Sequence, residues 1–74
     1  MKLHVHSNLW RQIHFNILTY HVEFHGDLPT RKEDIENLLY TYNVKVHKSF
    51  EGRWEEIEIL LDEEEITLFL LRFA

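Results

Sequence analysis

The sequence predicts a single α+β domain, residues 1–74, in which one helix packs on an antiparallel sheet in about ββαβββ order. Residues 54–61 alternate between two sets of side chains, as a half-buried strand does. Residues 35–42 instead repeat apolar side chains at helical spacing. A chain of 74 residues is long enough for only one such domain.

The C-terminal part is predicted to be a three-stranded antiparallel meander. Its first strand covers residues 44–50, where apolar side chains alternate. A hairpin from Trp54 to Phe73 supplies the other two strands. The acidic run 62–65 cannot be buried and is expected to form the turn of that hairpin. Residues 66–73 are almost wholly apolar and are expected to form the last strand.

The N-terminal third is harder to assign, because two patterns compete in it. Residues 2–6 alternate like a short strand. Residues 9–25 are rich in β-branched and aromatic side chains, and their alternation changes phase once, as at a β-bulge. We therefore expect a long bulged strand there. A helix over residues 9–17, capped by Ser7, is the alternative.

One helix is predicted over residues 31–42. Thr30 and Glu33 have the spacing of a capping box, in which each satisfies a free backbone N–H group of the other. Asn43 suits the left-handed position after a helix end. The apolar stripe of this helix consists of Ile35, Leu38, Leu39 and Tyr42.

The negative charge of the chain lies in one segment. The net charge is −5, but residues 51–65 hold eight acids and one base, a local charge of −7. The remainder holds five acids and seven bases, a charge of +2. This distribution disfavours direct binding to nucleic acid, whose phosphates require a basic surface. It favours a protein partner with a basic surface.

Several classes of function are disfavoured by the composition. The chain has no cysteine, and its six histidines lack the spacing of a recognised metal site, so no metal or other cofactor is expected. It has no glycine-rich phosphate loop and no paired acid and base, so no enzyme is expected. No apolar run approaches the ~20 residues of a membrane span, and we expect a cytoplasmic protein that binds no membrane.

The acids have two interpretations. Eight carboxylates along a hairpin of ~27 Å would give about one charge per 3.4 Å, close to the phosphate spacing of a DNA strand. The hairpin would then mimic DNA in a basic channel. Alternatively, the acids only keep the hairpin soluble. The candidate partner-binding acids are Glu55, Glu56, Glu58, Asp62, Glu63, Glu64 and Glu65.

The predicted hairpin has a second apolar face that one helix cannot cover. Trp54, Phe69, Leu71 and Phe73 share this face if Leu61 pairs with Ile66. The N-terminal segment, a second copy of the chain or a target protein must then cover it. A homodimer is the expected assembly.

The pentapeptide Glu65–Phe69 resembles the Gln-Leu-Ser/Asp-Leu-Phe peptide with which bacterial proteins dock on the replication sliding clamp. Ile66 stands at the first Leu, Thr67 at the small polar position, and Leu68 and Phe69 match. Glu65 replaces the Gln.

With its small size and acidity, the chain resembles small phage-encoded inhibitors of the bacterial sliding clamp. The resemblance implies a protein that binds the host clamp and blocks DNA or partner access. The acids would plug the basic channel, or residues 66–69 would fill the peptide pocket. Another DNA-binding protein with a basic channel is a possible target on charge alone.

Overall fold

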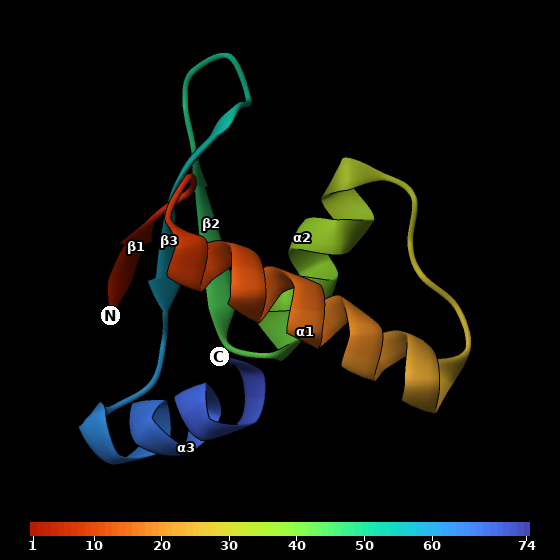
Figure 1. The fold of residues 1–74 in the computed structure, drawn as a ribbon. Coiled ribbons are helices and arrows are strands. Elements are labelled where there is room, and N and C mark those ends of the chain that lie inside the picture. Colours follow the sequence, from red (N-terminus) through yellow and green to blue (C-terminus); the bar gives the residue numbers. More distant parts are fainter.

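The computed structural model describes all residues, 1–74, and has three helices and a three-stranded antiparallel sheet. The α+β class is therefore confirmed. The order along the chain is βααββα, not ββαβββ (Figure 1). None of the helices has the length and apolar character needed to cross a membrane. The elements are β1 (Lys2–His4), α1 (Asn8–His25), α2 (Lys32–Thr41), β2 (Val44–Lys48), β3 (Trp54–Ile59) and α3 (Glu63–Phe73).

The sheet has the order β1-β3-β2, so β3, which was predicted over residues 54–61 and ends at Ile59, is the central strand. Leu3 and Val46 lie on either side of Ile57 and share its face. Ile57 is fully buried, which places this face against the helices. β2 and β3 form the real hairpin of the protein, through residues 49–53.

The long bulged strand predicted over residues 9–25 is wrong, because these residues form α1. The alternative, a helix over residues 9–17, has the correct element type, but α1 continues for eight more residues to His25. The Ser7 side chain caps the helix by accepting a hydrogen bond of 3.2 Å from the Trp10 N–H group. The helix ends at Gly26, whose φ of 80° is a left-handed conformation that glycine adopts readily. Burial of one helical stripe overrides the β propensity of the individual residues.

The hairpin predicted from Trp54 to Phe73 is also wrong. Residues 63–73 form α3, and the predicted turn 62–65 is its cap and first turn. The Asp62 carboxylate accepts a hydrogen bond of 2.9 Å from the Glu65 N–H group. The acids favour a helix here because they complement the positive end of its dipole.

The helix predicted over residues 31–42 is confirmed as α2, one residue shorter at each end. Its predicted cap is wrong: the residue before the helix is Arg31, with no side-chain cap, and Thr30 lies outside it. Asn43 does have the expected left-handed backbone, with φ 64°.

The core joins all three helices to the sheet, and each of its buried residues is apolar. In α1 and α3 the buried residues recur every three or four positions, which is the spacing of one helix face. The sheet contributes from β2 and β3. The core residues are Trp10, Ile13, Ile17, Leu39, Val44, Ile57, Ile59, Phe69 and Phe73.

Candidate protein-binding site

The predicted acids do not form one ribbon. Glu56 and Glu58 lie on the outer face of the sheet, whereas residues 62–65 begin α3. Lys2 lies 3.7 Å from Glu56, and the Nε2 atom of His47 lies 2.9 Å from a carboxylate oxygen of Glu58. These basic neighbours offset the two glutamates, so the strand cannot present a row of free negative charges.

The outer face of the sheet is polar, which corrects the prediction of a second apolar face. Strand register places Glu58 between Lys2 and Lys45, and Glu56 between His4 and His47. Such a face is stable in water and needs no covering segment. Phe69, Leu71 and Phe73, which were expected on it, belong to α3 instead.

The contact between His47 and Glu58 predicts a pH dependence of stability. The hydrogen bond from His47 lowers the pKa of Glu58 in the folded protein. A lowered carboxylate pKa stabilises the fold above the unfolded pKa, and the gain is lost as the pH falls through the folded value. We therefore expect Glu58→Gln to reduce the loss of stability between about pH 5 and pH 3.

Urea unfolding at a series of pH values measures this effect. His47→Gln is the companion variant, since it removes the same contact from the other side. Both variants should lose less stability on acidification than the natural chain. If both variants lose as much stability on acidification as the natural chain, the contact between His47 and Glu58 does not contribute to the pH dependence of stability.

The acidic run 62–65 is exposed at the start of α3, and none of its carboxylates forms an ion pair. The backbone N–H group of Glu65 lowers the pKa of Asp62, the capping residue. The hydrogen bond and charge of Asp62 in turn raise the pKa of Glu65. The side chains of Glu63 and Glu64 take no part in the cap. We call residues 62–65 the acidic end of α3.

Residues 66–69 are helical, so they do not form the extended segment that a docking peptide requires. Phe69 is only 7% exposed and Ile66 packs against the core. Thr67 donates a hydrogen bond of 3.1 Å to the backbone oxygen of Glu63, as side chains within helices do. Thr67 and Leu68 are both exposed, and Leu68 is 69% exposed. The predicted pocket-filling role of this segment is therefore not supported by its conformation.

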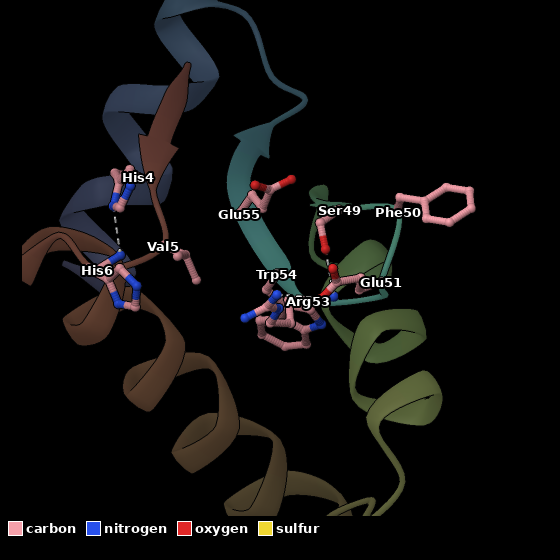
Figure 2. Close-up of a pocket in the computed structure, with 9 residues that line it drawn as sticks. All are labelled: His4, Val5, His6, Ser49, Phe50, Glu51, Arg53, Trp54 and Glu55. Atoms are coloured by element: carbon pink, nitrogen blue, oxygen red, sulfur yellow. Dashed lines mark hydrogen bonds and ion pairs between the residues drawn. The ribbon is translucent and has the colours of Figure 1, made fainter.

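Glu55 lies apart from the other acids, beside an irregularity in the pairing of β2 and β3. It lines a shallow pocket of about 350 Å³ with His4, His6 and Arg53 (Figure 2). The Nδ1 atom of His4 accepts a hydrogen bond of 3.1 Å from the backbone of His6. Phe50, at the tip of the hairpin, also lines this pocket and is fully exposed.

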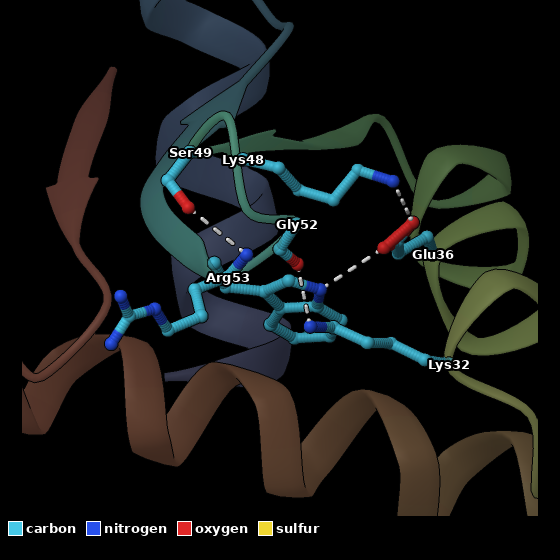
Figure 3. A network of polar contacts seen from close by, with 7 residues as sticks. Lys32, Glu36, Lys48, Ser49, Gly52 and Arg53 are labelled. Atoms are coloured by element: carbon cyan, nitrogen blue, oxygen red, sulfur yellow. Dashed lines mark hydrogen bonds and ion pairs between the residues drawn. The ribbon is translucent and has the colours of Figure 1, made fainter.

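A polar network fixes the β2–β3 hairpin on α2 (Figure 3). The Glu36 carboxylate accepts hydrogen bonds of 3.0 Å from both the Trp54 indole and the Lys48 ammonium group. Lys32 donates to the backbone oxygen of Gly52, at 2.7 Å. Burial raises the pKa of Glu36, but the hydrogen bonds from Lys48 and Trp54 lower it on balance. These side chains are therefore used in holding the fold together.

Metal-ligating side chains do not cluster: no three His, Asp or Glu residues lie close enough to share an ion. The rings of His21 and His25 stack at 4.6 Å along α1. His14 packs between Trp10 and Trp54, and burial lowers its pKa. These three histidines thus pack as rings against their neighbours.

The sequence interpretation missed an apolar surface on α1. Phe15 and Val22 are 69% and 39% exposed, and Leu18 lies between them at half-buried depth. Their spacing of three and four residues was a signal for it, but only if residues 9–25 were read as a helix. We call residues 15, 18 and 22 the outer face of α1.

No protein-family model, curated protein or solved structure matches this chain. Its function is therefore inferred from its own surfaces. Two of them stand out: the acidic end of α3, whose carboxylates have no basic partner within the chain, and the outer face of α1, where Phe15 and Val22 are exposed.

Proposed function

We propose that this chain is a non-catalytic inhibitor that binds a DNA-handling protein at its basic channel. The bacterial replication sliding clamp is the candidate target. The contact is made by the acidic end of α3. The observation that carries the proposal is that four consecutive exposed carboxylates there have no basic partner within the chain.

The remaining acids present less free charge. Glu36, Glu51, Glu56 and Glu58 each contact a basic side chain of the same chain: Lys48, Arg53, Lys2 and His47, respectively. The other unpaired acids are scattered singly or in twos along the sequence. The densest uncompensated charge therefore lies at residues 62–65, and a basic surface is the partner that such charge attracts.

The helix changes how such charge would be presented. Four residues rise only about 6 Å along an α-helix, so the carboxylates form a compact cluster and not a ribbon. Basic side chains that bind successive phosphates can also bind such a cluster, and their binding releases the counterions of the carboxylates. The domain is small, with extents of 33 × 29 × 20 Å, which suits a body that enters a channel.

Charge reversal at Glu63 and Glu64 tests this proposal. The double variant Glu63→Lys/Glu64→Lys keeps the capping residue Asp62 and the pair it forms with Glu65. We expect its affinity for a purified bacterial sliding clamp to fall about tenfold or more, because two attractions become repulsions.

The matched control is Glu33→Lys/Asp34→Lys, which makes the same charge change in the first turn of α2. Both of these residues are exposed and lie outside the proposed contact. The control should retain most of the affinity. Equal losses in the two variants would show that only net charge matters, and would overturn the assignment to α3.

A small assembly module with no basic target is the second candidate. The observation that favours it is that the acids already have a local role, since Asp62 caps α3 and the others lie at the positive end of its dipole. Under this alternative, the charge-reversed variant should unfold more readily and the natural chain should bind no clamp. Binding and unfolding measurements on the same variants distinguish the two candidates.

A further inference from the structure

We propose that the outer face of α1 is the interface of a homodimer, in which the α1 helices of two copies pack antiparallel. The axis of two-fold symmetry would pass close to Leu18 and Thr19, the midpoint of the face. This inference does not depend on the target of the acidic end of α3, because the two surfaces share no residue.

The first observation is that α1 is apolar on two opposite sides. Trp10, Ile13 and Ile17 are buried in the core. Phe15 and Val22 face away from it and remain exposed. A surface helix normally has one apolar stripe and a polar opposite side, so the second stripe indicates a surface that is covered by another protein.

The second observation is a hollow beside this face. A depression of about 330 Å³ extends from α1 to the loop that follows it. Its apolar lining can receive a large side chain from a partner helix. In an antiparallel pair, Phe15 of each copy lies opposite Val22 of the other and next to this hollow. The lining residues are Phe15, Leu18, Thr19, Val22, Glu23 and Leu28.

Charge complementarity favours a second copy as the occupant. Arg11 precedes the outer face by one turn, whereas Glu23 and Asp27 follow it, and none of the three forms an ion pair within the chain. Antiparallel packing brings Arg11 of each copy to the acidic end of the other face. There it also meets the negative end of the partner's helix dipole. The surface is thus self-complementary, as a two-fold interface must be.

Sedimentation equilibrium of the full chain tests the dimer. The expected mass is twice that of the 9.1 kDa chain. Phe15→Asp should raise the dimer dissociation constant by about 30-fold or more, as expected for loss of an aromatic anchor and burial of a charge. Phe50→Asp is the matched control, because it places the same charge at an exposed phenylalanine on the hairpin tip. Circular dichroism should show that both variants remain folded.

A charge swap tests the arrangement itself. Arg11→Glu and Glu23→Arg should each weaken the dimer, and the double variant should recover most of the lost affinity. A monomeric natural chain at 100 μM would overturn the proposal, and so would a dimer that survives Phe15→Asp. Failure of the double variant to recover would overturn the antiparallel arrangement. Clamp binding by a monomer would leave the proposed function intact while removing this interface.

Discussion

Replacing Phe69 by Ala is expected to lower the free energy of unfolding by about 3–5 kcal/mol. Phe69 is 7% exposed, and its ring packs 5.1 Å from that of Phe73. The substitution removes this contact and leaves a cavity between α3 and the rest of the core. A domain of this size has little stability to lose, so much of the variant should be unfolded at 37 °C. Urea denaturation followed by circular dichroism measures the change.

Leu68→Ala is the matched control for Phe69→Ala. Leu68 is the preceding residue on the same helix, but it is 69% exposed, so its truncation should cost about 0.5 kcal/mol or less. If residues 66–69 were instead an exposed docking peptide, both truncations would leave stability unchanged. Equal stabilities in the two variants would therefore contradict the packing of α3.

Trp10→Ala is expected to lower the free energy of unfolding by a similar amount, about 3–5 kcal/mol. Trp10 is 2% exposed near the start of α1 and stacks on His14 at a ring distance of 5.0 Å. Its loss removes the largest buried side chain of the core. Trp10→Phe retains an aromatic ring and should lower the free energy of unfolding much less.

Thermal unfolding by circular dichroism compares the two Trp10 variants. The ellipticity at 222 nm should also show that the remaining folded fraction keeps its helical content. A Trp10→Ala variant as stable as the natural chain would show that α1 does not depend on this anchor. That result would contradict the core described above.

The sequence predicts those elements whose local signals agree with one another. For α2, the apolar stripe and Asn43 both favour one helix at one place, and the helix forms there although the predicted capping box does not. For β3, strict alternation agrees with burial of Ile57 and Ile59. The α+β class follows from these two elements, and the structure confirms it.

The two segments assigned to the wrong type of element are those where local signals conflict. Residues 9–25 and 66–73 are rich in β-branched, aromatic or leucine side chains that also fit a strand. The spacing of buried residues resolves the conflict only when the rest of the core is known. In α3, Asp62 and Glu65 also have the spacing of a capping box, which signals the start of a helix. The same run of acids also fits a charged turn, so this signal is ambiguous.

The candidate site could be predicted only in part, for the same reason. The exposure of residues 62–65 follows from their charge alone, and the structure agrees. Their arrangement depends on the type of element that carries them. Because residues 63–73 form α3 and not a strand, residues 62–65 do not lie on the same element as Glu56 and Glu58. The side chain of Phe69 is buried in the core. The outer face of α1 likewise exists only if residues 9–25 are helical.

The salt dependence of binding to the sliding clamp is the most direct test of the acidic end of α3. The affinity of the natural chain for the purified clamp should be measured by calorimetry at 50 mM and 200 mM NaCl. We expect it to fall about tenfold or more over this range, and duplex DNA held in the clamp channel to compete. An affinity that is independent of salt, or the absence of any binding at low salt, would contradict the account.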